Sequence, residues 1–176
     1  MHARPVPGFS LIEVLVAILV LAVGALGTAA AQLAAIQTRH DTALMSSGVH
    51  LAASLAERMR ANRPHTASYL QYDYDALTAA PPQPGLSCQA GASCDGAQMA
   101  AFDLSETSAA VYAGFPGGRV KVCRDGASAA TLSWSCGGGA QSPVVVKLGW
   151  RAKGDQADDG AKFVPSVAIV ALGAAP

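Results

Sequence analysis

Residues 8–17 read Gly8-Phe9-Ser10-Leu11-Ile12-Glu13-Val14-Leu15-Val16-Ala17, and they begin an apolar segment that extends to residue 31. Glu13 is the only ionisable side chain within residues 9–31. As an α-helix this segment is about 35 Å long, which is enough to cross a hydrocarbon layer of about 30 Å. An arginine precedes the segment and the next charges come at positions 39 and 41, an asymmetry that favours a cytoplasmic N-terminus and export of the remainder.

The overall charge of the chain is balanced. Of 176 residues, 51% are hydrophobic and 14% are charged, with 12 basic and 12 acidic side chains. Neutralising phosphates requires a basic surplus or stripe, so we expect no nucleic-acid partner. The apolar composition also excludes intrinsic disorder over most of the length.

Three interpretations of the apolar segment compete. A secretory signal peptide cleaved after Ala31 satisfies the small-residue rule, but its apolar region would exceed the usual length of roughly 7–15 residues. A plain N-terminal anchor is the second interpretation. Neither explains Glu13, because a carboxylate inside an apolar helix costs about 2.5–3.5 kcal/mol near the bilayer centre and usually has a partner.

The third interpretation rests on a resemblance. Glycine, an aromatic residue, an apolar pair and glutamate occur in order before a spanning segment, which resembles the cleavage and assembly motif of type IV pilins and type II secretion pseudopilins. The resemblance implies that residues 1–8 are a leader, that a prepilin peptidase cuts between Gly8 and Phe9, and that Phe9 is then N-methylated. The Phe9 α-amine and the Glu13 carboxylate of adjacent subunits can compensate each other's burial, so Glu13 would set the axial register of a filament.

The helix is predicted to continue beyond the apolar segment. Residues 9–31 form its transmembrane and assembly half, and residues 32–63 form an amphipathic half with an apolar stripe at i, i+3/i+4 spacing. The stripe comprises Leu33, Ile36, Leu44, Gly48, Leu51, Leu55 and Met59. Asn62 is a candidate C-terminal cap and Pro64 follows it, so one helix of about residues 9–62 is expected.

The end of this helix carries a second resemblance. Residues 55–63 read Leu55-Ala56-Glu57-Arg58-Met59-Arg60-Ala61-Asn62-Arg63, which resembles the helix-end signature of the PilV group of minor pilins. Its basic last turn complements the helix dipole. The three arginines fit a solvated helix end better than a patch that binds a partner.

The remaining chain divides into two regions. Residues 64–118 include the turn-rich stretch at 81–85, and we predict a variable loop region with little regular structure beyond a short helix within 100–111. The acidic residues Asp73 and Asp75 are interpreted as polar surface. In residues 119–176, alternating apolar residues predict four strands near 120–124, 132–136, 144–150 and 163–172.

These elements predict an α+β fold. Four successive strands form an antiparallel meander, one face of which can cover the amphipathic half of the long helix. Pro165 should place the last strand at an edge or delay its start. This is the pilin-like architecture, with a long N-terminal helix packed on a C-terminal sheet.

The four cysteines are Cys88, Cys94, Cys123 and Cys136. Their spacing contains no CxxC pair and does not fit a zinc ribbon. In an exported domain, disulfides are the default. Three pairings are possible, and we favour the sequence-local one, Cys88 with Cys94 and Cys123 with Cys136, which would contribute about 2.4 and 3 kcal/mol.

No pattern supports an enzyme, a cofactor or a metal site. Asp155, Asp158 and Asp159 lie in one loop, but their spacing does not match an EF-hand. The four histidines, at positions 2, 40, 50 and 65, show no metal-binding spacing. We therefore predict a structural, non-catalytic protein.

The resemblance implies a function and a set of partners. A minor type IV pilin would be processed by a prepilin peptidase and N-methyltransferase in the bacterial inner membrane, with its C-terminal domain in the periplasm. It would join other minor pilins and the major pilin, prime pilus assembly and support a tip adhesin in adhesion and twitching motility. The alternatives are a minor pseudopilin of type II secretion, which the signature at residues 55–63 disfavours, and a DNA-uptake pilin, which the charge balance disfavours.

Overall fold

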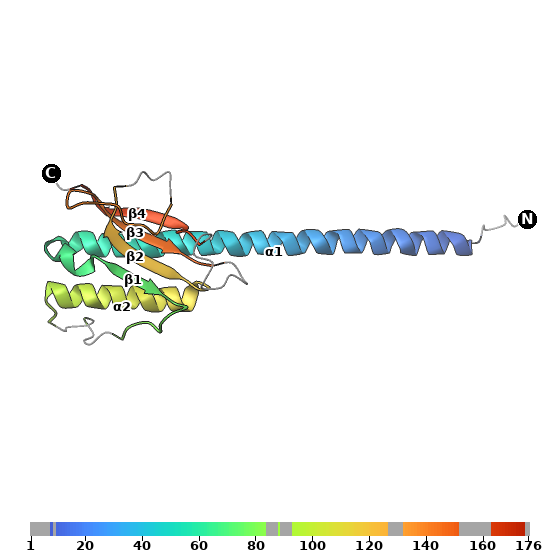
Figure 1. Cartoon of the computed structure of the whole chain (residues 1–176). Coiled ribbons are helices and arrows are strands. Elements are labelled where there is room, and N and C mark those ends of the chain that lie inside the picture. Colours follow the sequence, from blue (N-terminus) through green and yellow to red (C-terminus); the bar gives the residue numbers. More distant parts are fainter. Residues whose placement is uncertain are drawn as a thin grey trace, which may run out of the picture. The chain divides into compact units, whose positions relative to one another are not determined.

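The computed structural model describes Gly8, residues 10–83, Cys88, and residues 93–126, 132–151 and 163–174 (Figure 1). Contacts divide the chain into unit 1, residues 1–42, and unit 2, residues 43–176. The first helix, α1 (Leu11–Ala61), begins in unit 1 and ends in unit 2. Its bounds closely match the predicted helix of residues 9–62.

Unit 1 consists of the first part of α1. All of its described residues are exposed, large aliphatic side chains included. An 18-residue window in α1 has a mean hydropathy of 2.5, so by length and composition this helix can cross a membrane. A helix that is apolar all round yet exposed requires a lipid or protein environment.

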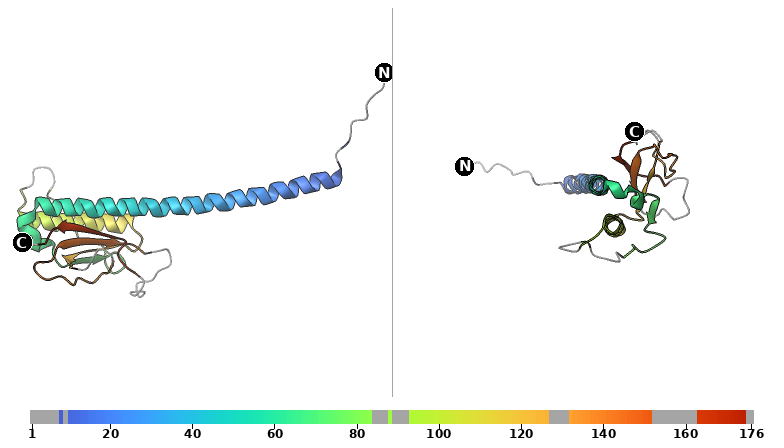
Figure 2. Two further views of the ribbon diagram at one scale, coloured as in Figure 1. Left: turned by 90° about the horizontal axis from the view of Figure 1, so that it is seen from above. Right: turned by 90° about the vertical axis from the view of Figure 1, so that its left-hand side faces the viewer.

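Unit 2 contains an antiparallel sheet of four strands in the order β1 (Tyr72–Asp75), β2 (Arg119–Arg124), β3 (Val144–Gly149) and β4 (Val167–Leu172). The C-terminal part of α1 and the helix α2 (Gly96–Gly114) lie on the same side of this sheet (Figure 2). A 3-10 helix, η1 (Arg63–Tyr69), connects α1 to β1. The predicted α+β, pilin-like fold is confirmed.

The hydrophobic core lies between the two layers. From α1 it receives Leu55 and Met59, and from the sheet it receives alternate residues of the two central strands. These sheet residues are Val120, Val122, Val144, Val146 and Leu148. The predicted stripe of α1 turns inward here because its 3.6-residue period places Gly48, Leu55 and Met59 on one face. A Cβ on Gly48 would lie 2.7 Å from the ring of Trp150, so the helix approaches the sheet closely at this residue.

The prediction of a strand at residues 132–136 is wrong. The sheet has four strands because β1, which was not predicted, takes the place of that segment. Residues 132–139 lack strand structure, although Leu132, Trp134 and Cys136 alternate with serines. β1 pairs with β2, with Tyr72 opposite Val122 and Tyr74 opposite Val120. The alternation of tyrosine with aspartate in residues 72–75 is the pattern of a strand with one apolar face.

The prediction of little regular structure in residues 64–118 is also wrong. This region contains η1, β1 and α2, which has 19 residues. α2 begins at a capping box, in which Asp95 accepts from the Gln98 backbone and the Gln98 side chain accepts from the Asp95 backbone. The predicted short helix therefore begins further upstream than expected. The prediction for Pro165 agrees with the structure, because β4 starts at Val167 and is an edge strand.

Cross-strand ion pairs hold β1 to the sheet. Asp73 accepts two hydrogen bonds from Arg119, at 2.8 and 2.7 Å, and pairs with Lys121 at 3.0 Å. Burial alone would raise the pKa of Asp73, but the hydrogen bonds and charges of Arg119 and Lys121 outweigh it and hold this pKa below its usual value. Asp75 likewise pairs with Arg151 at 2.6 Å. These aspartates were predicted to be polar surface. They also form ion pairs that attach β1 to other parts of unit 2.

The lowered pKa of Asp73 predicts how its contribution depends on pH. A carboxyl group with a depressed pKa in the folded state stabilises the fold above its unfolded pKa, which is about 3.9, and loses this effect as pH falls through the folded pKa. Because Asp73 is partly exposed, we expect Asp73→Asn to destabilise unit 2 by only about 0.5–1 kcal/mol at pH 7. The difference should vanish in acid. Urea unfolding from pH 7 to pH 3 measures it, with Asp41→Asn in unit 1 as the control; a pH-independent difference would contradict the assignment.

Candidate functional site

The N-terminal end of α1 is the candidate assembly segment. The backbone carbonyl of Ser10 accepts from the N–H groups of Glu13 at 3.0 Å and Val14 at 3.3 Å, so helical hydrogen bonding begins two residues after Gly8. Gly8 itself is exposed. Phe9, the predicted methylation site, lies outside the described residues. The glycine of the predicted cleavage position is therefore exposed and lies upstream of the helix.

Glu13 lies in the first turn of α1 and is exposed. The positive end of the helix dipole favours a carboxylate in this turn. Within the described part of the chain, no basic side chain pairs with Glu13. Its immediate neighbours Ile12 and Val14 are exposed apolar residues. The segment thus presents one carboxylate on a hydrophobic helix, whose charge requires a partner when the helix is buried.

The threonine hydroxyl groups in the unit 1 part of α1 donate hydrogen bonds to backbone carbonyls of the same helix. Thr28 donates to the carbonyl of Ala25 at 2.9 Å, Thr38 to that of Ala34 at 3.0 Å, and Thr42 to that of Thr38 at 2.8 Å. Such bonds satisfy the hydroxyls without water. In residues 11–31 of α1, the carboxylate of Glu13 is therefore the only side-chain polar group without an intrahelical partner.

The C-terminal end of α1 is held to the rest of unit 2 by three polar side chains, which we name the helix-end cluster. They are Arg58, Arg60 and Asn62. Arg58 bonds to Asp103 at 3.0 Å and to Glu106 at 2.6 Å, both on α2. The hydrogen bond to Glu106 raises the pKa of Arg58. Arg60 donates to the carbonyls of Ala171 at 2.8 Å and Val170 at 2.7 Å on β4.

Asn62 completes the cluster at the end of the helix. Its side-chain amide donates to the Gly96 carbonyl at 2.6 Å and to the Tyr69 hydroxyl at 3.1 Å. Tyr69 in turn donates to buried Asp103 at 2.6 Å, and burial raises the pKa of the Tyr69 phenol well above its usual range. Arg58 and Arg60 are exposed, as the sequence predicts for a solvated helix end, and they also bond to defined acceptors. Apart from Glu57, which pairs with Arg60 within the helix, their acceptors lie 45 to 111 residues away in sequence, so local pattern could not reveal them.

Comparison with protein families identifies both parts of α1. Residues 5–29 match the prokaryotic N-terminal methylation motif. Residues 30–105 match the family described as type IV pilin Tt1218. The chain is a type IV pilin-like protein. No curated protein and no solved structure gave a match.

The two matches have direct consequences. Type IV pilins are structural and non-enzymatic, so the prediction that this pilin-like protein is not an enzyme is confirmed. The methylation motif implies processing by a prepilin peptidase. The two matches are consecutive, and together they extend from residue 5 through α1, η1 and β1 into α2. They do not single out the PilV group.

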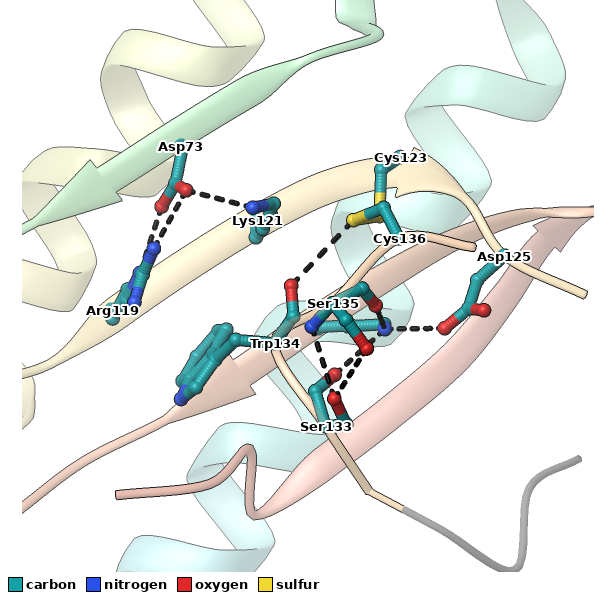
Figure 3. The surroundings of a disulfide bond; sticks show 10 residues. Asp73, Arg119, Lys121, Cys123, Asp125, Ser133, Trp134, Ser135 and Cys136 are labelled. Carbon is teal, nitrogen blue, oxygen red and sulfur yellow. Dashed lines mark hydrogen bonds and ion pairs between the residues drawn. A yellow bond between two sulfur atoms is a disulfide. The ribbon is translucent and has the colours of Figure 1, made fainter. Parts of the chain in front are cut away.

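The pilin-like protein contains both sequence-local disulfides. Cys88 bonds to Cys94 and Cys123 to Cys136, with Cα–Cα distances of 5.8 and 6.0 Å. The second bond attaches residues 132–138, which we name the strap, to β2 (Figure 3). The predicted strand of residues 132–136 is therefore attached to β2 through a disulfide and does not pair with it as a strand.

The strap covers a buried lysine on the central strand. Lys147 of β3 is 3% exposed, and its ammonium group pairs with Asp125. The same group donates to the backbone carbonyls of Ser133 at 2.7 Å and Ser135 at 2.6 Å. An ammonium group has three donors, and these three acceptors satisfy all of them. Trp134 lies beneath the Arg119 guanidinium, which is 4.8 Å from the ring centroid.

The described residues contain no metal centre. No group of three or more His, Cys, Asp or Glu side chains among them could hold an ion. The aspartates at 155, 158 and 159 and the histidine at position 2 lie outside the described residues. His40 and His50 are exposed on α1, and His65 is exposed in η1.

Proposed function

We propose that this protein is a minor type IV pilin whose α1 joins it to other subunits through Glu13. Cleavage after Gly8 creates an α-amine on Phe9, which is then N-methylated and remains cationic. In an assembled filament the Glu13 carboxylate of one subunit pairs with this amine of its neighbour. The supporting observation is that Glu13 is the only charged side chain in residues 11–31 of α1, all of which are exposed.

Burial gives this pairing its directional effect. A carboxylate that enters an apolar environment alone is costly, and the same is true of an amine, so the two favour the one axial offset at which they meet. Before assembly the apolar half of α1 lies in the inner membrane and unit 2 lies in the periplasm. After assembly unit 2 lies on the cell surface as part of the pilus.

The minor role rests on the helix-end signature at residues 55–63 and its resemblance to the PilV group. In this role the protein joins other minor pilins, primes assembly by the major pilin, and supports an adhesin at the pilus tip. Adhesion and twitching motility then depend on it indirectly, because both require assembled pili.

Deletion of the gene and quantification of the protein in purified pili test this proposal. We expect far fewer copies of this protein than of the major pilin in sheared pili. Deletion should lower the number of surface pili and reduce twitching, and the intact gene should restore both. Co-purification with secretion components in place of pilus components would instead assign the protein to a type II secretion pseudopilus. A salt-sensitive complex with DNA would favour a DNA-uptake pilin.

A further inference from the structure

We propose that the Cys123–Cys136 disulfide is a redox-controlled latch, which holds the strap closed over Lys147 and releases it on reduction while the core of unit 2 stays folded. The strap lies on the face of the sheet opposite the helices, and it supplies two of the three acceptors of the Lys147 ammonium group. The latch therefore controls the exposure of the strap-covered face of β3.

Little apart from the disulfide holds the strap. None of residues 132–138 is fully buried, and Ser135, Cys136 and Gly137 are exposed. Among the described residues, its other contacts are the hydrogen bonds to Lys147, one backbone bond from Gly138 to Arg124 at 3.2 Å, and the contacts of the Trp134 ring with Arg119 and Phe163. Because Ser135, Cys136 and Gly137 are exposed, this part of the strap gains little hydrophobic stabilisation to oppose its conformational entropy.

The core does not depend on the strap. The hydrophobic cluster is formed by α1, η1, α2 and the helix-facing residues of the sheet, and no strap residue belongs to it. When the strap opens, water replaces the carbonyls of Ser133 and Ser135 as partners of Lys147, so no buried charge is left unsatisfied. Opening is thus a local event and leaves the two layers in place.

The redox step is a thiol–disulfide exchange. Closing the latch forms the S–S bond between Cys123 and Cys136, and the two thiols lose two electrons and two protons to a disulfide oxidant, which becomes a dithiol. Reduction by a dithiol reverses the step. Export into an oxidising compartment therefore closes the strap, since such compartments favour the disulfide.

Acylation of Lys147 in the full-length protein tests the latch. N-hydroxysuccinimidyl acetate modifies accessible amines, and peptide mass spectrometry gives the rate at Lys147 relative to the partly exposed Lys121. We expect Cys123→Ser/Cys136→Ser to accelerate labelling of Lys147 by about tenfold or more. Dithiothreitol should do the same in the wild-type protein. The matched control, Cys88→Ser/Cys94→Ser, lacks the other disulfide and should leave Lys147 protected.

Amide hydrogen exchange distinguishes local opening from unfolding. Val122 and Val146 are fully buried in the central strands, and their amides should keep their protection in the latch variant. Equal labelling of Lys147 in the latch variant and the wild type would overturn the proposal. Loss of protection at Val122 and Val146 together with the strap, or equal acceleration in the control variant, would overturn it as well.

Discussion

Replacement of Gly8 by aspartate is expected to leave the protein uncut. The resemblance to the prepilin motif implies a cut after Gly8, which is a small, exposed residue upstream of α1. Intact mass of the membrane-extracted protein should show full conversion of the wild type to a chain that begins at methylated Phe9. The Gly8→Asp chain should retain residues 1–8 and lack the methyl group, so the effect is close to all-or-none.

A second substitution separates cleavage from assembly. Glu13→Val leaves Gly8 intact, so the chain should be cut normally but should be lost from sheared pili, because it no longer offers a carboxylate to the neighbouring amine. A wild-type chain that begins at Gln32 would instead reveal cleavage by signal peptidase after Ala31, and it would overturn the processing assignment. Normal incorporation of Glu13→Val would remove the proposed role of Glu13 in register.

The largest effect on stability is expected for Met59→Ala. Met59 is 0% exposed and belongs to the core between α1 and the sheet. Its truncation removes apolar contacts and leaves a cavity, and such changes cost about 2–5 kcal/mol. Urea unfolding of the full-length protein in detergent measures the loss. Tryptophan fluorescence reports on unit 2 alone, because Trp134 and Trp150 both lie there.

Met45 provides the matched control on the same helix. It is 44% exposed, so Met45→Ala should change the free energy of unfolding by no more than about 0.5 kcal/mol. Equal losses for the two variants would show that α1 is not docked on the sheet through Met59. A loss for Met59→Ala below about 1 kcal/mol would contradict the placement of this side chain in a closely packed core.

The elements that the sequence predicted well are those with a long, uninterrupted period. The predicted helix of residues 9–62 combines an apolar run with an apolar stripe of 3.6-residue period. Both patterns favour a helix without help from tertiary contacts, and α1 forms there. β2, β3 and β4 also agree with the alternation, since each carries apolar residues toward the helices. The motif around Gly8 and Glu13 was accessible to sequence reasoning because it is contiguous.

The errors arose where tertiary contacts decide the structure. Residues 132–136 alternate like a strand, but Cys136 is bonded to Cys123 and the carbonyls of Ser133 and Ser135 bond to Lys147. In a strand these backbone carbonyls would accept hydrogen bonds from a neighbouring strand. Here they accept from the Lys147 side chain instead. In α2 the short polar residues Ser105, Thr107 and Ser108 are buried with their hydroxyls bonded to helix carbonyls, so this helix lacked a clear amphipathic pattern.

The helix-end cluster also determines how unit 2 bears mechanical load. Arg58 reaches α2, Arg60 reaches the edge strand β4, and Asn62 reaches both Tyr69 and the start of α2. Tension applied along the last turns of α1 therefore strains these bonds side by side, in shear, and no single bond carries it first. Traction on this end of the helix would thus be transmitted to α2, η1 and the sheet together.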